Sequence, residues 1–213
     1  YMVLGNADLT PEQSNSLTAS LAYNTPVFDG NADYNVEISS HYSDTKDLIT
    51  TVTDVEQSAA EGLDISVYQN IENAKIHGFD LSNEVTFNQW MAQLNYSYVE
   101  SRDDNEKRLE GRPRHQVKFN LGYEFSDWDL ESLIYVLYQR GEAVSARYTG
   151  VENNAYTIVN LTVNQYVSQN LQWNFALNNI FDIHKSPEAI AQGLFDARPT
   201  SSREIRLGVE YKF

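Results

Sequence analysis

Apolar and polar residues alternate along most of this chain. In the closing stretch, SSREIRLGVEYKF, Ile205, Leu207 and Val209 lie on one side of the alternation, whereas Arg206 and Glu210 lie on the other. Successive side chains of a β-strand point to opposite faces, so this pattern predicts a strand with one apolar and one polar face. The same period of two recurs in nine segments, namely residues 17–23, 32–42, 66–87, 90–98, 117–125, 128–138, 159–163, 171–177 and 205–213. No segment shows a 3.6-residue period, and the chain is therefore predicted to be all-β and antiparallel.

The connections between these segments alternate in length. Short connections are expected near residues 25–31, 88–89, 126–127 and 168–170, and long polar ones near residues 43–64, 101–114, 141–154 and 183–201. Outer-membrane β-barrels have short turns at one end and long loops at the other. A water-soluble β-sandwich, which is the alternative, would have loops of roughly equal length. The pattern therefore favours a transmembrane β-barrel.

Aromatic residues stand near the ends of the predicted strands. The examples are Tyr23, Tyr42, Trp90, Trp128, Tyr166 and Phe213. Such positions suit the two aromatic girdles that mark the membrane interfaces of a barrel. The apolar rows between the girdles are expected to face lipid. The polar rows, for example Glu37, Lys118, Glu124, Arg206 and Glu210, are expected to face the lumen.

The number of strands bears on how the sheet closes. Single-chain bacterial barrels have an even number of strands, whereas nine is odd, so the first and last strands cannot close as antiparallel neighbours. We therefore expect the chain to be part of a larger barrel. Dividing residues 43–87 into two strands would instead give ten, which leaves a small complete barrel open as an alternative.

Composition narrows the choice of partners and architecture. The formal net charge is −15, which argues against nucleic acid because little positive charge is available to neutralise phosphates. No run of about 18 apolar residues occurs, which excludes a membrane-spanning helix. Cysteine is absent, so the chain has no disulfide and no thiolate metal site. The chain begins with Tyr1 rather than Met, which favours an internal piece of a longer protein over a chain that has lost a signal peptide.

Five segments resemble, in order, motifs of the TonB-dependent outer-membrane receptors. GNADLTPEQS resembles their N-P-x-L-x-P-E segment, with Ala7 in place of proline, and YQNIENAKIHGFDLSNEVTF resembles their Y-x-N-x-x-x-A-x-x-x-G-x-E strand, with Asp80 in place of glutamate. RLEGRPRHQVKFNLGY resembles the L-x-x-x-P-x-H start of a strand, and LQWNFALNNIFDIHK resembles the N-L-F-D segment, with Ile180 replacing leucine. The closing stretch resembles the final G-R-x-(x)n-F strand, although Ser202 stands where glycine is common. Together the five segments span the chain, which is therefore similar to this family.

This resemblance implies a 22-stranded barrel with an N-terminal plug, of which residues 1–213 would supply about the last nine strands. It implies uptake of a scarce ligand, typically an iron–siderophore or cobalamin, energised by the TonB complex, with no catalysis and no cofactor. The plug, the TonB box and the earlier strands would lie outside this sequence. The expected location is the bacterial outer membrane, and the expected partners are its lipid, the plug and the rest of the barrel. The loops look closest to those of catecholate-siderophore, colicin I and cobalamin receptors.

Cationic and aromatic side chains in the long loops are the candidates for ligand binding. Arginine and tyrosine would hold an anionic ferric siderophore by charge and by stacking. The candidates are Arg147, Tyr148, Arg198, Arg102 and His184, with Arg147 and Tyr148 foremost. Alternatively, the loop arginines pair locally with Asp103, Asp104 or Glu106. His184 is also a candidate axial ligand for haem, against the simpler interpretation of a solvated loop histidine.

Three other positions carry structural predictions. Gly78 predicts a kink or bulge that faces the lumen, where the plug would pack closely. Pro113 marks the start of a strand. The cluster Asn178, Asn179 and Asp182 predicts a turn rather than a calcium site, which needs six to eight oxygen ligands.

Two other classes of function remain as alternatives. An outer-membrane hydrolase would need a nucleophile and an acid–base set at the loop end of the barrel. The short-range candidates are Asp182 with His184 and His41 with Asp44, and neither pair has a recognisable nucleophile beside it. A purely structural or adhesive barrel is the third class, and it would be favoured if the chain were complete as given.

Overall fold

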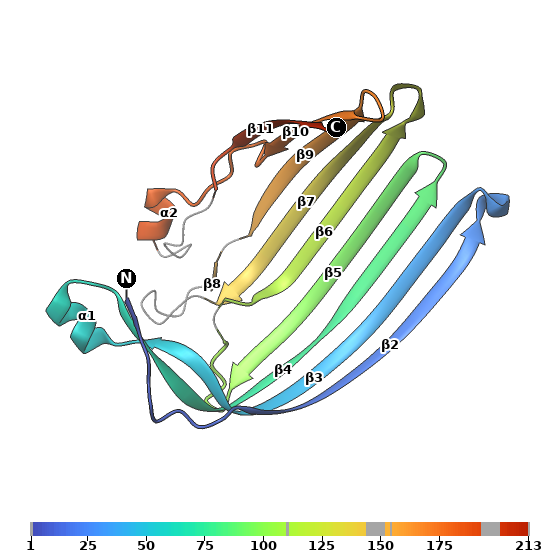
Figure 1. Cartoon of the computed structure of the whole chain (residues 1–213). Coiled ribbons are helices and arrows are strands. Elements are labelled where there is room, and N and C mark those ends of the chain that lie inside the picture. The colour runs from blue at the N-terminus through green and yellow to red at the C-terminus, as the bar shows by residue number, and fades with distance from the viewer. Residues whose placement is uncertain (1, 110, 144–151, 154, 193–200, 213) are drawn as a thin grey trace.

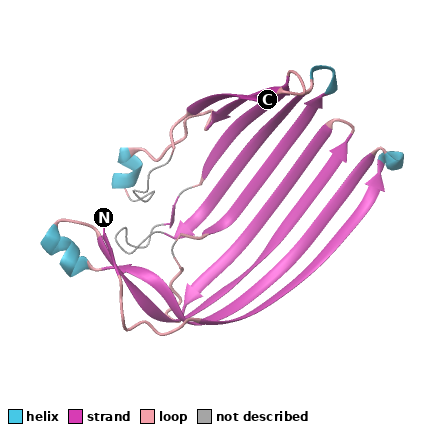
Figure 2. Ribbon diagram, viewed as in Figure 1, coloured by secondary structure: helices cyan, strands magenta, loops and turns pink. Residues whose placement is uncertain are grey.

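The computed structural model describes residues 2–109, 111–143, 152–153, 155–192 and 201–212. Most of these residues belong to one curved sheet (Figures 1 and 2). Its nine long strands are β2 (Gln13–Val27), β3 (Ala32–Thr53), β4 (Ile65–Phe87), β5 (Trp90–Asp103), β6 (Pro113–Phe125), β7 (Leu130–Ala143), β9 (Tyr156–Tyr166), β10 (Leu171–Asn178) and β11 (Glu204–Tyr211). Two short strands, β1 (Met2–Leu4) and β8 (Glu152–Asn153), pair with β4 and β7.

The nine long strands lie side by side in the order in which they occur in the chain. Each is antiparallel to its neighbours, whereas the short β1 pairs in parallel with β4. The prediction of nine antiparallel strands is therefore confirmed, and β1 and β8 are additions to it. Pro113 begins β6, as predicted. The sheet is open, with β2 and β11 at its two edges (Figure 1).

Short and long connections lie at opposite ends of the sheet, as predicted. At one end, here named the turn end, the strands are joined by the 3₁₀-helices η1 (Phe28–Gly30) and η2 (Ser126–Trp128) and by turns at residues 88–89 and 167–170. The opposite end, here named the loop end, carries α1 (Val55–Glu61) and α2 (Pro187–Ala191) in its longer connections (Figure 1).

The two α-helices were not predicted, because seven and five residues are too few to show a helical period. Their caps are nevertheless ordinary. Asp54 accepts a hydrogen bond of 2.9 Å from the backbone N–H of Gln57, and Gly62 ends α1 in the left-handed conformation that glycine adopts readily. Ser186 caps α2 through Ala189 in the same way. Neither helix, within the described residues, is long and apolar enough to cross a membrane.

The hairpin of β3 and β4 is longer than predicted. Residues 43–64 were expected to form a polar loop, but β3 continues to Thr53 and β4 begins at Ile65. Their register continues from Ala32 opposite Phe87 to Thr53 opposite Ser66. Charged residues interrupt the apolar alternation after Tyr42, while threonine, isoleucine and valine dominate residues 48–53 and favour extended backbone. The β-branched content was therefore the better guide to the end of the strand.

Cross-strand register separates the sheet into two faces. One row of partners contains Leu21, Ile38, Leu81, Tyr96, Val117 and Tyr138. The face to which this row belongs is here named the apolar face. Its positions from the turn end up to Tyr42, Phe79, Tyr98 and Tyr138 include no charged residue in the described strands. Such a face suits lipid, which cannot hydrate a charge.

Aromatic residues bound the apolar face at both ends. At the turn end, Phe28 packs on Phe87, Trp90 on Tyr123, and Phe125 on Trp128, with ring centroids 6.0, 4.5 and 6.0 Å apart. At the boundary of the apolar face nearer the loop end, Phe79 stacks on Tyr98 with ring centroids 5.8 Å apart. Trp90 and Tyr98 are eight residues apart on β5, or about 27 Å along the strand. With the usual tilt this spans about 20 Å, near the height of a membrane barrel's apolar band. Phe213, also predicted as a girdle residue, lies outside the described residues.

The opposite face, here named the polar face, carries the predicted lumen-facing residues. Glu37 and Lys118 share one register row through Ser82 and Asn95. Glu124, Arg206 and Glu210 alternate with apolar-face residues on β6 and β11 in the same sense. Neutral polar side chains bond across the strands, as in Ser82 to Asn95 at 2.7 Å and Asn120 to Gln93 at 2.9 Å. The two-faced pattern read from the sequence is therefore present in the fold.

Gly78 occupies a regular strand position, and the predicted kink or bulge is wrong. It pairs with His41 on β3 and Val99 on β5 without a break in either register. A Cβ atom at this position would lie 2.1 Å from the carbonyl oxygen of Tyr98 and 2.9 Å from Cε1 of His41. Glycine is therefore required because the backbone of β5 and the His41 ring approach closely, and the ring is also held 3.5 Å from Asp80.

Gly78→Ala is expected to lower the free energy of unfolding by about 1–3 kcal/mol, the usual cost of overpacking. Urea unfolding of the whole receptor barrel in lipid vesicles would measure it. Gly122→Ala is the matched control, because a Cβ at Gly122 would meet its neighbours at 3.5 Å or more, an ordinary contact distance. Equal losses in the two variants would contradict the explanation by close approach.

Candidate functional site

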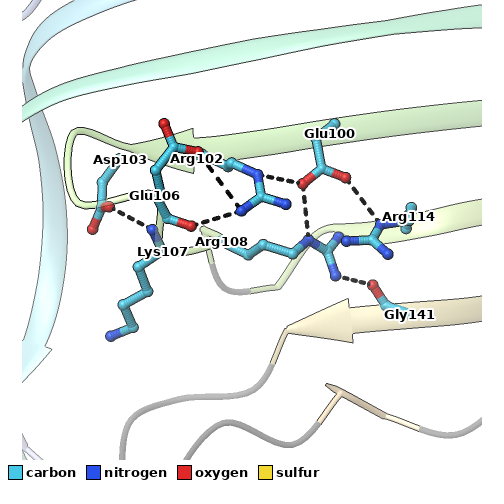
Figure 3. Close-up of polar contacts among 8 residues, drawn as sticks. All are labelled: Glu100, Arg102, Asp103, Glu106, Lys107, Arg108, Arg114 and Gly141. Carbon is cyan, nitrogen blue, oxygen red and sulfur yellow. Dashed lines mark hydrogen bonds and ion pairs between the residues drawn. The ribbon is translucent and has the colours of Figure 1, made fainter.

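A charged cluster lies where β5, β6 and β7 reach the loop end. The carboxylate of Glu100 accepts a hydrogen bond from Nε of Arg102 at 2.9 Å, and it pairs with Nε of Arg114 at 3.0 Å and of Arg108 at 3.6 Å (Figure 3). Arg108 also donates through Nη1 to the backbone carbonyl of Gly141 on β7, at 2.8 Å. One carboxylate thus gathers three guanidinium groups from β5, β6 and the segment between them.

The chain reaches this arrangement by folding back after β5. Asp103 accepts hydrogen bonds of 2.9 Å from the backbone N–H groups of Asn105 and Lys107, which closes a tight turn. Leu109 then donates its N–H to the carbonyl of Ser101 at 3.0 Å. Arg108 therefore comes to lie opposite Arg102, and the two cations flank Glu100.

The charged cluster is largely buried, and its role is structural. The side chains of Glu100 and Arg108 are both only 10% exposed, so neither charge is well hydrated. Three neighbouring guanidinium groups repel one another, and the carboxylate between them offsets that repulsion. Arg102, in addition, donates to the backbone carbonyl of Glu106 at 2.8 Å. The cluster fixes segment 104–109 against the sheet.

A cavity of about 760 Å³ opens beside this segment. One wall consists of residues 48–53, at the loop end of β3, together with α1. The other wall is the segment that follows β5. Its apolar lining residues include Leu48, Val52, Val55 and Leu109. Its charged lining residues are three cations, Lys107, Arg108 and Arg112, and two carboxylates, Asp64 and Asp103. The cavity therefore offers apolar contact and a small excess of positive charge at the loop end.

Of the five predicted ligand-binding residues, two lie within the described part of the chain. Arg102 lies in the cluster, where it pairs with Glu100 and Glu106, so local pairing holds for this residue. His184 lies apart from it and lines a second cavity with Tyr138 and Phe181. Arg147, Tyr148 and Arg198 lie outside the described residues, and their roles stay predictions.

The short-range acid–histidine pairs do not form catalytic dyads. Nδ1 of His184 contacts the backbone carbonyl of Asp182 at 2.7 Å, while the Asp182 carboxylate accepts the N–H of Arg203 at 2.8 Å. His41 faces Asp80, whereas Asp44 lies three residues away on the other face of β3.

The predicted turn at the end of β10 is present. The side chain of Asn179 donates to the carbonyls of Ile183 and Ser201, both at 2.8 Å, and accepts from the Ile183 N–H at 2.9 Å. These bonds occupy the amide in closing the turn. Within the described residues, no group of three or more histidine, aspartate and glutamate side chains could hold a metal ion.

Sequence reasoning missed Glu100 and Arg114. For Glu100 the sequence does contain a signal, because a charged residue stands at the position that would continue the apolar row of Tyr96 and Tyr98. A charge in that row marks the point at which the strand leaves the apolar band. The arginines that satisfy it could not be assigned without the turn at Asp103.

The family described as "TonB dependent receptor-like, beta-barrel" matches residues 1–180. The vitamin B12 transporter BtuB of Photobacterium profundum is 24% identical over 180 residues, which are 84% of this chain and 28% of that protein. The chain thus spans less than a third of the length of this relative.

Solved structures of transporters share the fold. The copper transporter OprC superposes with a TM-score of 0.71 at 18% identity, over 97% of this chain and 32% of that one. The FrpB iron transporter from Neisseria meningitidis (F3-3 variant) gives 0.68 at 18% identity, over 100% and 32%. The siderophore receptor PirA from Acinetobacter baumannii gives 0.69 at 18% identity, over 99% and 33%. These relatives are transporters and receptors, which supports the prediction that the chain is not an enzyme. The family match over residues 1–180, together with this fold, shows that the chain belongs to the TonB-dependent receptor β-barrel family.

Proposed function

We propose that residues 1–213 form the last nine strands of a larger barrel, about 22 strands in all, in a bacterial outer membrane. The open sheet and the small share of each relative that the chain covers support this. The apolar face would contact lipid, and the polar face would contact the plug and water. The plug would carry the contact with the TonB complex that energises uptake.

The ligand we propose is an iron–siderophore, an anionic metal chelate with apolar or aromatic parts. The observation that carries this choice is the cavity at the loop end, where Lys107, Arg108 and Arg112 meet an apolar wall. In a chain of net charge −15, a cavity lined by three cations and two carboxylates, Asp64 and Asp103, has a local excess of positive charge, which favours an anionic ligand. Arg147, Tyr148 and Arg198 are proposed as further contacts from the neighbouring loops, whereas Arg102 is paired within the charged cluster and His184 lines the second cavity.

Cobalamin is the second candidate. It is favoured by the 24% identity to a vitamin B12 transporter. Cobalamin and a ferric siderophore differ in charge, because a ferric catecholate carries several negative charges. Reversal of a cavity cation therefore separates the two ligands.

Uptake by the whole receptor tests the proposal. A strain that lacks its own siderophore receptors should grow on a ferric siderophore as sole iron source when it carries this receptor, and growth should require TonB. Parallel cultures would supply cyanocobalamin to a strain that needs it. Growth on neither ligand would contradict the proposal, and growth on cobalamin alone would favour the second candidate.

Arg112→Glu is expected to weaken binding of an anionic siderophore by about tenfold or more, since it replaces an attraction by a repulsion in a partly enclosed cavity. Titration calorimetry on the purified whole receptor would measure the dissociation constant. Lys212→Glu at the turn end is the control, because it makes the same charge change beyond β11, at the opposite end of the sheet. Equal effects in both variants would show that only net charge matters.

A further inference from the structure

A second cavity lies on the apolar face, near the loop-end aromatic residues. Its volume is about 440 Å³, and it is lined by Tyr138 of β7, by Thr157 and Val159 of β9, and by Phe181 and Ile183, which follow β10. Val159 pairs with Val136, and Thr157 pairs with Tyr138. Both pairs belong to the apolar face. The groove therefore opens toward the side on which a barrel meets lipid.

The lining residues are unusual for a surface that faces water. Phe181 is 64% exposed and Ile183 is 40% exposed, although each has a polar neighbour in sequence. Exposed apolar side chains of this size gain free energy when hydrocarbon covers them. An acyl chain is a suitable occupant for a groove with this lining.

Positive charge lies beside the groove. Arg140 is exposed on β7, two residues beyond Tyr138 and on the same face, with His115 as its cross-strand partner. Lys185 also lines the groove.

Charge on this face changes abruptly at the aromatic boundary. Between the two aromatic girdles, the described strands present no charged side chain to the apolar face. The next positions on this face after Tyr138, Tyr98 and Tyr42 are Arg140, Glu100 and Asp44, so Arg140 is the cation at this level beside the groove. The level just outside an aromatic girdle is that of lipid headgroups. Guanidinium groups bind phosphate through paired, charge-assisted hydrogen bonds.

We propose that this groove binds a phosphorylated lipid of the outer leaflet, with an acyl chain against Tyr138, Val159 and Phe181 and a phosphate group on Arg140. This inference rests on the proposed outer-membrane location, but it does not depend on which ligand the receptor transports. Its occupant is the surrounding lipid, on the outside of the barrel, and the transported ligand is bound elsewhere.

Native mass spectrometry of the purified whole receptor tests this proposal. The delipidated receptor in detergent would be titrated with purified lipid A and, separately, with the same lipid after its phosphates have been removed. Arg140→Gln should weaken lipid A binding about tenfold, as expected for the loss of one charge-assisted contact. Phe181→Ala should weaken binding of both lipids. Lys118→Gln is the control, because Lys118 is an exposed cation on the polar face.

Three outcomes would overturn the proposal. The Arg140 and Phe181 variants bind lipid A as tightly as the parent, or removal of the phosphates leaves binding unchanged, or inorganic phosphate alone displaces the lipid. Siderophore binding, measured on the same preparation, keeps the two proposals separate. A receptor that binds siderophore but shows one of these outcomes would contradict the lipid site alone. A receptor that binds lipid A as expected but does not bind siderophore would contradict the ligand assignment alone.

Discussion

Replacement of Glu100 by leucine is expected to lower the free energy of unfolding by about 3–5 kcal/mol, the usual cost of breaking a buried ion pair. The variant leaves Arg102, Arg108 and Arg114 close together without the carboxylate that lies among them. Arg108 suffers most, because its side chain is only 10% exposed and cannot recover full hydration. Urea unfolding of the whole receptor, refolded into lipid vesicles, would measure the loss.

Glu106→Gln is the matched control for this variant. Glu106 lies 3.8 Å from Arg102 in the same cluster, but its side chain is 83% exposed. Exposed ion pairs contribute about 0–1 kcal/mol, so the control should change stability little. Similar losses in both variants would contradict the role given to burial.

Leu207→Arg is expected to cost about 2–4 kcal/mol of folding free energy if Leu207 lies near the bilayer midplane. Leu207 lies opposite Phe175 in the middle of β11, on the apolar face, and is 77% exposed in the chain by itself. Lipid would cover this position in the membrane, and an arginine there would have to carry its charge into hydrocarbon. The same unfolding assay would measure the effect.

Glu210→Leu serves as the test of the facing assignment. Glu210 lies on the polar face opposite Gln172, three residues farther along the same strand. It should tolerate leucine with a change of less than about 1 kcal/mol, the size expected for an exposed charge. A large loss for Glu210→Leu together with a tolerated Leu207→Arg would invert the assignment of lipid and lumen.

Periodicity was sufficient to predict the sheet, because a half-buried strand must alternate and each of the nine long strands does so within the apolar band. The polar face shows this best, since Glu37 and Lys118 are placed on one register row by alternation alone. Alternation failed at residues 43–53, where strand pairing continues beyond the apolar band. Outside that band water hydrates both faces, and the pattern that reports burial disappears.

The candidate site was less predictable than the fold. Arg102 was identified as a loop cation, but its main partner, Glu100, was assigned to no role. The pairing depends on the turn at Asp103, which brings Arg108 back beside the strand, and such a turn brings together residues that no fixed spacing connects. For Gly78, the sequence could not reveal that its neighbour is the ring of His41.

The two edges of the open sheet have a consequence for handling this chain in isolation. Within the described residues, β2 pairs only with β3, and β11 pairs only with β10. Each edge therefore presents a row of unpaired backbone N–H and C=O groups, and on β11 these lie beside exposed Ile205, Leu207 and Val209. Long apolar edges of this kind promote aggregation, because any extended chain can form hydrogen bonds with their unpaired backbone groups. Separated from the rest of the proposed barrel, the chain is expected to self-associate through these two edges. In the proposed barrel, the remaining strands would pair with both edges and prevent this.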